Sequence, residues 1–495
     1  MQPLGQFIDG AHVTGSGGRV EVANPADGSV VATLGEATPA DVDTAVAAAR
    51  AAFPAWAAAP PGERSTALLA LADRMQARAE QYARTESAQS GKPIKLTREF
   101  DVPGSIDNVR FFAGAARLLS GMAQGEYDAT HTSSIRREPI GVVGSIAPWN
   151  YPLQMAMWKV LPAVAAGNTI VLKPAESTPL TSLMFAEDAV AAGIPAGVIN
   201  VLTGPGRTVG EALVSHAGVS MVSFTGSTPV GQRVMQLATG TIKRVHLELG
   251  GKAPFVVFDD ADLEAAANGA VAGSLINSGQ DCTAATRAYV QRPAFDEFVA
   301  RVAALMGTVR LGDPSDPGTD QGPLISRRQQ ESVDGYVQRA VAAGARVVCG
   351  GQVPAEGALA AGAFYPPTLI VDAAQGSEIV AEELFGPVLV VLPFDTDDDG
   401  IRLANDTPYG LAASAWTTNT FRAGRASREI MAGCVWINDH IPIVSEMPHG
   451  GFKASGFGKD MSLYSLEEYT HIKHVSADIT GEARKDWHRT IFGDR

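Results

Sequence analysis

The segment that decides the fold is GVVGSIAPWNYPLQMAMWKVLPAVAAGNTIVLKP, residues 141–174. Its β-branched run at 142–146 is followed by a helical run at 153–166 and by a second apolar run at 169–172. The same alternation continues downstream, with helical runs near 180–192 and 209–215 and β-rich runs at 198–202 and 221–224. Repeated crossovers of this length produce a parallel sheet with helices on both faces. The sequence therefore predicts a doubly wound α/β lobe.

A second series of strand candidates follows the glycine pair at 250–251. These candidates lie at 255–258, 288–291, 346–349, 389–394, 414–417 and 435–438. Short strand-like runs occur up to about residue 40, and helical spacing prevails from residue 41 to about 116. A chain of 495 residues also exceeds what one core usually serves. We expect two α/β lobes divided near 250–251, a β preamble, a helical cover and a surface loop over the alanine-rich stretch 355–363.

Charge and hydropathy argue against nucleic acid or a membrane as a partner. The formal net charge is −14, and no basic patch offsets the repulsion of a phosphate backbone. The longest apolar stretch, 155–172, is interrupted by Lys159, Pro162 and Asn168, too soon for a membrane span. We therefore expect a small-molecule substrate.

The three cysteines, Cys282, Cys349 and Cys434, are odd in number and widely spaced. This pattern suits reduced thiols rather than a disulfide framework, and without a CxxC motif we predict no metal site. Residues 1–17 lack the basic and apolar regions of a signal peptide. The expected compartment is the cytoplasm.

Three segments carry candidate catalytic side chains. SGQDCT puts Cys282 in a Gly-containing turn, where a thiol can face a cleft, although a free cysteine is more commonly a small core residue. VHLELGG ends an apparent strand with Glu248, a carboxylate suited to general-base work or to a structural salt bridge. IAPWNYP puts Asn150 at a strand end, where its amide can donate to an oxyanion or form an Asx turn.

Two further segments have features of a dinucleotide site. VLKPAE supplies Lys173 and Glu176 just past a central strand, where parallel sheets bind dinucleotides. FTGSTPVG runs from a strand through Gly226 and Ser227 towards a helix N-terminus. It lacks the spacing GxGxxG, so as a phosphate motif it is weak by itself.

These five segments occur together and in order, and with them the chain resembles the aldehyde dehydrogenase superfamily over essentially its whole length. The likeness extends through EELFGP at 382–387 to PHGGFK at 448–453. Within the superfamily, SEMPHGG at 445–451 and GKDMSLY at 458–464 look like the bacterial γ-aminobutyraldehyde dehydrogenases.

The resemblance implies an aldehyde-dehydrogenase-like fold of two doubly wound parallel-sheet lobes plus a β oligomerisation extension. It implies a dinucleotide-binding domain at 1–122 and 145–250, a catalytic domain at 251–453, and oligomerisation segments with a C-terminal tail at 123–144 and 454–495. Family members pair through the extension and through a C-terminal strand. We expect a homotetramer or a homodimer.

The resemblance also implies the chemistry. Cys282 is the expected nucleophile, which attacks an aldehyde to give a thiohemiacetal and then a thioester. The Asn150 amide and the backbone N–H of Cys282 are expected to stabilise the oxyanion, and Glu248 to activate the water that hydrolyses the thioester. The presence of Glu248 argues against relatives that pass the acyl group to coenzyme A.

The expected cofactor is NAD. The family pattern puts Lys173 and Glu176 on the adenosine ribose, Gly226 and Ser227 near the pyrophosphate, and Glu383 with Phe385 around the nicotinamide ribose and ring. The remaining expected contacts are Ile146, Pro148, Trp149 and Leu249. Glu176 would accept hydrogen bonds from ribose hydroxyls and repel a 2′-phosphate, so NADP is the weaker alternative.

The expected substrate is an ω-aminoaldehyde such as 4-aminobutanal, which arises in polyamine (putrescine) breakdown. Tyr151 and Trp158 would line the substrate tunnel, and Asp281 and Thr283 flank the nucleophile. Asp281, Asp107 and Glu446 could hold an ammonium group, and Trp158 offers a cation–π face. The alternative interpretation makes Asp107 and Glu446 surface ion-pair partners and Asp281 a turn cap.

The residues alone leave other substrates and other functions as alternatives. Betaine aldehyde, 3-aminopropanal and uncharged aldehydes are the alternative substrates. A different enzyme class is an NAD-independent thiol hydrolase with His246 or His449 as the base of Cys282. A non-enzymatic dinucleotide-binding scaffold is the third hypothesis, which the joint presence of Cys282, Glu248 and Asn150 disfavours.

Overall fold

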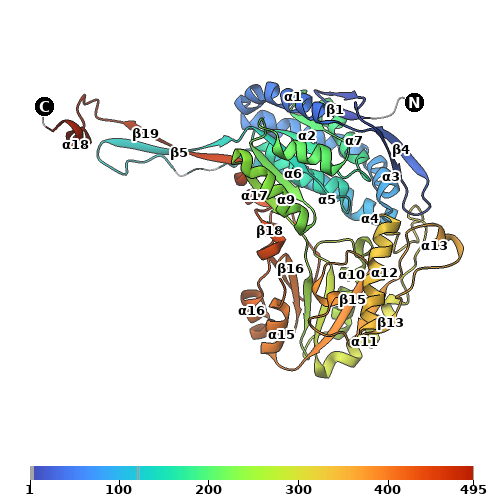
Figure 1. Cartoon of the computed structure of the whole chain (residues 1–495). Coiled ribbons are helices and arrows are strands. Elements are labelled where there is room, and N and C mark those ends of the chain that lie inside the picture. Colours follow the sequence, from blue (N-terminus) through green and yellow to red (C-terminus); the bar gives the residue numbers. More distant parts are fainter. Residues whose placement is uncertain (1–4, 120, 122, 494–495) are drawn as a thin grey trace.

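The structure is a computed structural model that describes residues 5–119, 121 and 123–493. Figure 1 shows two lobes, one above the other, and a thin arm that leaves the upper lobe and carries the C-terminus. The predicted domain and tail ranges also include residues 1–4, 120, 122 and 494–495, which lie outside the described residues.

The upper lobe is built on a sheet whose central strands are parallel and buried. Its order, within the described residues, is β18-β10-β9-β6-β7-β8-β1-β2. The strands are β1 (Gln6–Ile8), β2 (Ala11–Val13), β6 (Val142–Ile146), β7 (Thr169–Lys173), β8 (Ile199–Val201), β9 (Met221–Thr225), β10 (Arg244–Glu248) and β18 (Gly456–Phe457). Strands β6 to β10 pair in parallel, as the alternation predicted, and the antiparallel strands stand at the edges.

Helices cover both faces of this sheet. They are α1 (Pro39–Ala58), α2 (Pro61–Ala77), α3 (Ala79–Ser90), α4 (Ile94–Leu96), α5 (Val102–Ala115), α6 (Pro152–Ala165), α7 (Leu180–Ala191), α8 (Glu211–Ser215) and α9 (Thr228–Ala238). Alternate strand residues belong to different cores: Val143 packs in the core that includes α6, and Val142 packs in the core that includes α8. The period of two along the strand therefore serves two apolar layers.

Helix α6 is the central helix of the upper lobe. All of its residues are buried, between the sheet and the outer helices α2 and α5. A helix that is apolar on all sides must be enclosed, which its sequence PLQMAMWKVLPAVA dictates. Its one charged residue, Lys159, is neutralised by a buried ion pair with Asp460 at 2.6 Å.

The lower lobe repeats the parallel-sheet plan. Its order is β13-β14-β15-β12-β11-β16-β17 in the described chain, parallel except for β13. The strands are β11 (Ala253–Val257), β12 (Ala285–Gln291), β13 (Arg346–Cys349), β14 (Thr368–Val371), β15 (Val388–Phe394), β16 (Ala412–Trp416) and β17 (Cys434–Ile437). The helices are α10 (Leu263–Leu275), α11 (Arg292–Met306), α12 (Arg327–Ala342), α13 (Gly357–Ala361), α14 (Glu378–Ala381), α15 (Asp397–Asn405) and α16 (Thr420–Glu429).

The predicted two-lobed α/β architecture with a β extension is confirmed, and three details differ. The stretch expected as a loop at 355–363 contains the short helix α13, because alanine favours a helix even at the surface. Strand β14 was absent from the candidates. Residues 456–457, also absent from the strand candidates, form β18, which pairs with the otherwise open edge of β10.

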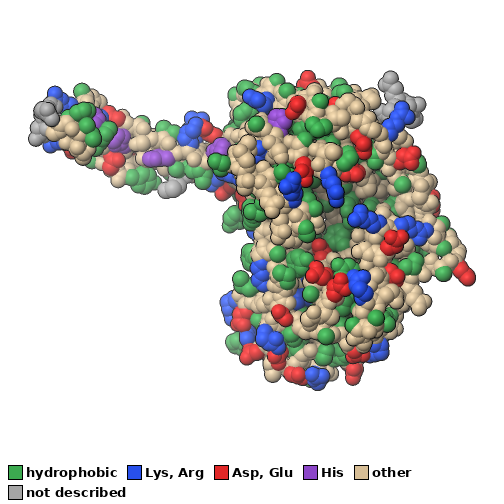
Figure 2. All heavy atoms as spheres, in the orientation of Figure 1, with side chains coloured by type: hydrophobic (Ala, Val, Ile, Leu, Met, Phe, Trp, Pro, Cys, Tyr) green, Lys and Arg blue, Asp and Glu red, His purple; other side chains and the backbone are tan. Residues whose placement is uncertain are grey.

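The arm is a two-stranded antiparallel ribbon. Strand β5 (His131–Pro139) pairs along its whole length with β19 (Thr470–Asp478), and the helices α17 (Ser462–Glu468) and α18 (Arg489–Phe492) precede and follow β19. Hydrophobic side chains and histidines stand along it in Figure 2, and on β19 Ile472 is 65% and Val475 37% exposed. A ribbon of two strands is marginally stable in water by itself. In the predicted β preamble, β1 and β2 join the upper sheet, whereas β3 (Arg19–Ala23) and β4 (Val30–Gly35) form a separate ribbon.

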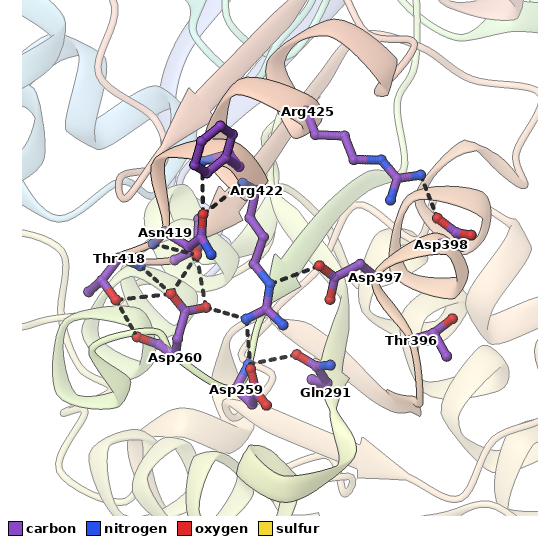
Figure 3. Close-up of polar contacts among 12 residues, drawn as sticks. Asp259, Asp260, Gln291, Thr396, Asp397, Asp398, Thr418, Asn419, Arg422 and Arg425 are labelled. Atoms are coloured by element: carbon purple, nitrogen blue, oxygen red, sulfur yellow. Dashed lines mark hydrogen bonds and ion pairs between the residues drawn. The ribbon is translucent and has the colours of Figure 1, made fainter.

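An ion-pair network closes the far end of the lower sheet. Arg422 lies within 2.7 Å of Asp259, 2.6 Å of Asp260 and 2.9 Å of Asp397, and these residues follow β11, β15 and β16 (Figure 3). The carboxyl ends of parallel strands are where open α/β sheets usually bind ligands. The lower lobe instead presents the amino ends of β12 and β15 to the upper lobe. No helix in the described part of the chain is long and apolar enough to cross a membrane.

Candidate active site

A cleft of about 260 Å³ lies where the carboxyl ends of β6, β9 and β10 meet the turn that precedes β12. It brings together the three predicted catalytic residues, Cys282, Glu248 and Asn150. The other lining residues are Pro148, Trp149, Thr225, Gly226, Ser227, Leu249, Gly250, Gln329, Ser332, Tyr336, Glu383, Leu384 and Phe385. The cleft therefore joins residues from both lobes that lie far apart in the sequence.

A strained turn presents Cys282 to the cleft. The backbone is left-handed at Asn277 (φ 50°), Ser278 (φ 56°) and Gly279 (φ 70°), immediately after α10. A Cβ atom at Gly279 would lie 2.1 Å from the carbonyl oxygen of Gly386, so only glycine allows this close approach. The turn thereby packs against the Phe385 loop and fixes the position of the thiol.

The surroundings of Cys282 disfavour its thiolate. Burial raises the pKa of the thiol well above its ordinary value, and the negative charges of Asp281, Glu248 and Glu383 raise it further. Its own backbone N–H acts in the opposite direction. The resting residue is therefore a neutral thiol, whose proton must leave when it attacks a substrate.

The effect of Asp281 on the pKa of the Cys282 thiol can be tested by alkylation. The rate at which iodoacetamide alkylates Cys282 is expected to rise with pH in the wild type, because only the thiolate reacts. Asp281→Asn removes a negative charge that raises the thiol pKa, so the rate profile should shift to lower pH. Cys282→Ala provides the background from Cys349 and Cys434. An unchanged profile, or a shift to higher pH, would show that Asp281 does not act on the thiol.

Asn150 is held at the carboxyl side of β6 by two buried contacts. The side-chain Nδ2 of Asn150 donates to the backbone carbonyl of Gln280 at 3.2 Å. The backbone carbonyl of Asn150 accepts from Asn277 Nδ2 at 2.7 Å. An amide nitrogen carries two N–H donors, so one remains for a ligand beside Cys282. This geometry suits an oxyanion-stabilising group.

Glu248 ends β10 with a carboxylate that is 3% exposed. Oε2 lies 3.2 Å from His449 Nδ1, and Oε1 has no hydrogen-bond partner among the described residues. A carboxylate with one unoccupied oxygen in a closed cleft can take a proton from water. Sequence reasoning named His449 only as a rival base and missed this contact.

The cleft also fits the predicted dinucleotide. Helix α9 begins there at the predicted pyrophosphate residues, and its N-cap Ser227 makes no side-chain capping bond, so the first-turn N–H groups, which Pro229 lacks, are open to phosphate oxygens. Trp149 and Phe385 meet edge to face at 5.3 Å. Glu383 accepts from Gly251 N–H at 2.9 Å, and burial raises the pKa of its carboxyl to about 7.

The remaining predicted cofactor residues lie outside the cavity lining. Ile146 and Lys173 end β6 and β7. Lys173 Nζ donates to the Pro174 carbonyl, and burial lowers the pKa of its ammonium to about 8 although the charge of Glu176 raises it. Glu176 is exposed and accepts from Gly206 N–H at 2.8 Å. All three lie at or just after the carboxyl ends of β6 and β7, the edge of the sheet at which the cleft lies.

The six predicted substrate residues fall into two groups, and none of them lines the cavity. In the first, Asp281 accepts from Tyr151 Oη at 2.8 Å and from Thr283 N–H at 2.7 Å and Oγ1 at 2.6 Å. Asp281 therefore does cap its turn, as the alternative interpretation held, while its charge still acts on Cys282. Lys92 Nζ, paired with Asp101, lies 3.5 Å from the centre of the Tyr151 ring.

The second group links α5 and α6 to the loop after β17. Trp158 Nε1 donates to Asn108, whose Nδ2 donates to Ser445 Oγ, which donates to Asp107 at 2.5 Å. Glu446 follows Ser445 and is exposed. The Trp158 ring also lies 5.0 Å from the His449 ring, which competes for the face that was expected to receive a cation.

Sequence reasoning missed the contribution of α12. Gln329, Ser332 and Tyr336 line the cleft from one face of this helix, at the spacing i, i+3, i+7. That spacing indicated an amphipathic helix, but nothing in the sequence said which lobe its polar face would meet.

The histidines proposed for a thiol hydrolase have other partners. His246 Nδ1 forms a hydrogen bond with Ser223 Oγ at 2.8 Å, and His449 Nδ1 contacts Glu248. Within the described chain, neither histidine forms a hydrogen bond with the Cys282 thiol. No three His, Cys, Asp or Glu side chains of the described residues are grouped so that they could hold a metal ion.

Comparison with known proteins gives the family. The model of the aldehyde dehydrogenase family matches residues 12–475. This chain belongs to the aldehyde dehydrogenase family. The predicted resemblance to the superfamily is thereby confirmed.

Individual relatives are similar over nearly their whole length. DhaS of Bacillus subtilis (strain 168) is 42% identical over 476 residues, 96% of this chain and 95% of DhaS. The crystal structure of PnpE from Pseudomonas sp. WBC-3 is 41% identical with a TM-score of 0.96, covering 99% of this chain and 100% of PnpE. The NAD+ complex of an aldehyde dehydrogenase from Bacillus cereus is 40% identical with a TM-score of 0.94, covering 97% of each chain.

Proposed function

We propose that this protein oxidises an aldehyde to its carboxylic acid with NAD, and that its substrates are ω-aminoaldehydes such as 4-aminobutanal. Oxidation of an aldehyde rests on family membership and on the cleft that joins Cys282, Glu248 and Asn150, which is the observation that carries the proposal. NAD agrees with the NAD+ complex of the similar Bacillus cereus enzyme and with the open N-terminus of α9.

The first chemical step is attack of the Cys282 sulfur on the aldehyde carbon. The thiol proton passes to solvent water, the C–S bond forms, and the carbonyl electron pair moves to oxygen. Asn150 Nδ2 and the backbone N–H of Cys282 donate to that oxyanion. NAD, when bound, supplies the acceptor for the hydride of the former aldehyde carbon, and a thioester on Cys282 remains.

The second step is hydrolysis of the thioester. Glu248 takes a proton from water through its unoccupied Oε1, and the water oxygen attacks the thioester carbon. The C–S bond then breaks, Glu248 returns its proton to the departing sulfur, and the carboxylic acid leaves, so Cys282 and Glu248 are back in their starting states. Glu248 gives this chain the hydrolytic group that transfer of the acyl group to coenzyme A would not need.

The narrower substrate class rests on charge. The segments SEMPHGG and GKDMSLY resemble γ-aminobutyraldehyde dehydrogenases, and Asp281 places a carboxylate directly beside the nucleophile. Asp107 adds a second, exposed carboxylate near Ser445. An ammonium group on the substrate would be attracted by both, whereas hexanal would gain nothing from them.

Substrate preference tests this class. We expect kcat/KM for 4-aminobutanal to exceed that for hexanal by about tenfold or more, which corresponds to about 1.4 kcal/mol of differential transition-state binding. Betaine aldehyde and 3-aminopropanal are measured beside them, with NAD and with NADP. Equal or faster use of hexanal would leave aldehyde oxidation intact and refute the ammonium site.

Asp281→Asn tests the carboxylate itself. The variant keeps the shape of the side chain and one oxygen acceptor for Thr283 but removes the charge, so KM for 4-aminobutanal is expected to rise by about tenfold while KM for hexanal changes little. The ratio of the two substrates separates the two roles of Asp281. An equal change for both would mean that Asp281 only caps its turn.

We further propose that the protein assembles as a homodimer or homotetramer through the arm of β5 and β19. The exposed apolar side chains of that ribbon support an interface with a second copy. Cys282, Cys349 and Cys434 are all free, which suits the cytoplasm as the compartment.

A further inference from the structure

His449 is a buried residue that the proposed reaction does not use. It lies in the loop between β17 and β18 and is 5% exposed. Its one side-chain hydrogen bond in the described structure is the 3.2 Å contact from Nδ1 to Glu248 Oε2. Within the described residues, Glu248 Oε2 likewise has no other hydrogen-bond partner. The two side chains therefore determine each other's position.

The backbone of His449 is held in place by a pair of hydrogen bonds. Its N–H donates to the Asp460 carbonyl at 2.9 Å, and Asp460 N–H donates back at 2.8 Å. Asp460 is itself held by its buried ion pair with Lys159 of α6. The imidazole packs at 5.0 Å against Trp158 of the same helix. The central helix of the upper lobe thus fixes both the backbone and the ring of His449.

The electrostatics of the pair favour a proton on His449. Burial lowers the pKa of this imidazole, but the hydrogen bond and charge of Glu248, together with the charges of Asp460 and Asp281, outweigh burial and raise it. The positive charge of Lys459, whose Nζ donates to the Gly450 carbonyl, also acts on Glu248. An N–H at Nδ1 can therefore donate to the Glu248 carboxylate before that carboxylate takes a proton.

The two carboxylate oxygens of Glu248 are in different situations. Oε2 is engaged by His449, and Oε1 is buried without a partner in the described structure. Rotation of the carboxylate would exchange them, and only a donor fixed on one side keeps the other oxygen open. A base that acts on a water molecule needs an open lone pair aimed at that water.

We propose that His449 is the positioning residue of the hydrolytic base: by donating from Nδ1 to Glu248 Oε2, it keeps Oε1 free to accept the proton of the water that cleaves the thioester. The inference rests on the proposed role of Glu248 in hydrolysis. It assigns His449 to the second step alone, because attack by Cys282 and oxidation of the thiohemiacetal use Asn150 and the bound cofactor instead.

Two variants separate hydrogen bonding from packing. His449→Asn places an amide N–H near the position of Nδ1 and loses the ring, whereas His449→Phe keeps a ring against Trp158 and loses the donor. NADH formation is followed by stopped flow with hexanal and betaine aldehyde, because a primary amine on the substrate could attack the thioester itself. The fast phase reports formation of the thioester and the steady state reports its hydrolysis.

For His449→Phe, we expect the fast phase to be retained and the ratio of its rate to the steady-state rate to rise by about tenfold or more relative to the wild type. His449→Asn should restore most of the steady-state rate. The inference is overturned if His449→Phe slows both phases equally or neither, or if His449→Asn behaves like His449→Phe. Melting temperature and NAD affinity, measured for each variant, identify a folding defect.

Glu248→Gln separates this inference from the proposed function. If Glu248→Gln stalls after the fast phase and His449→Phe does not, His449 has no positioning role while the hydrolytic base stands. If Glu248→Gln does not stall, the role of Glu248 is wrong and the inference about His449 is wrong with it.

Discussion

Replacing Cys282 by alanine is expected to abolish NADH formation from every aldehyde and to leave NAD binding intact. The thiol supplies the bond that converts the planar aldehyde carbonyl into a tetrahedral thiohemiacetal, the species from which hydride leaves, and no other cysteine lines the cleft in the described chain. Loss of a catalytic nucleophile costs on the order of 10⁶-fold in kcat in hydrolases with a comparable covalent intermediate. Steady-state NADH absorbance measures the activity, and quenching of tryptophan fluorescence measures NAD binding.

Cys434→Ala is the matched control, because Cys434 is also a half-buried free thiol but lies on β17. It should retain activity close to that of the wild type. Residual oxidation by Cys282→Ala within about tenfold of the wild type would mean that hydride can leave an aldehyde hydrate directly, and the covalent mechanism would be refuted.

Replacing Glu248 by glutamine is expected to slow turnover by about 10²- to 10⁴-fold while the first equivalent of NADH still forms rapidly. The amide keeps the size of the side chain and can still meet His449, but it cannot take a proton from water. The thioester therefore accumulates on Cys282. Stopped-flow absorbance with hexanal or betaine aldehyde resolves the fast phase, whose amplitude should approach one NADH per active site.

Glu383→Gln is the control for this prediction, since Glu383 is another buried carboxylate of the same cleft. Its proposed role lies with the cofactor, so it should change NAD affinity without producing a stalled acyl enzyme. Equal loss of the fast and slow phases in Glu248→Gln would place Glu248 in the attack of Cys282 rather than in hydrolysis.

Much of the upper lobe could be predicted because its signals are local. The runs at 142–146, 169–172 and 221–224 became β6, β7 and β9, and their parallel pairing follows from the crossover helices between them. Strand β18 could not be predicted in this way. A two-residue strand has no periodicity of its own, and its place beside β10 is set by a chain that returns after the whole lower lobe.

The candidate site shows the same difference between residues with a local sequence signal and contacts between distant parts of the chain. Cys282, Glu248 and Asn150 are each marked by a Gly or Pro turn at a strand or helix end, and the structure brings them to one cleft. The contact of His449 with Glu248 spans 201 positions and carries no local signal. Asp281 shows a different limit: the sequence could place it beside the nucleophile but could not reveal that Tyr151 and Thr283 occupy both of its oxygens.

The most direct test of the covalent mechanism is mass spectrometry of Glu248→Gln quenched in acid after mixing with NAD and an aldehyde. The aldehyde is hexanal or betaine aldehyde, whichever the wild type oxidises faster. We expect the peptide containing Cys282 to carry the acyl group of that aldehyde, and the modification to be absent when NAD is omitted. An unmodified Cys282 after a full equivalent of NADH has formed, or an acyl group on another residue, would contradict the covalent mechanism.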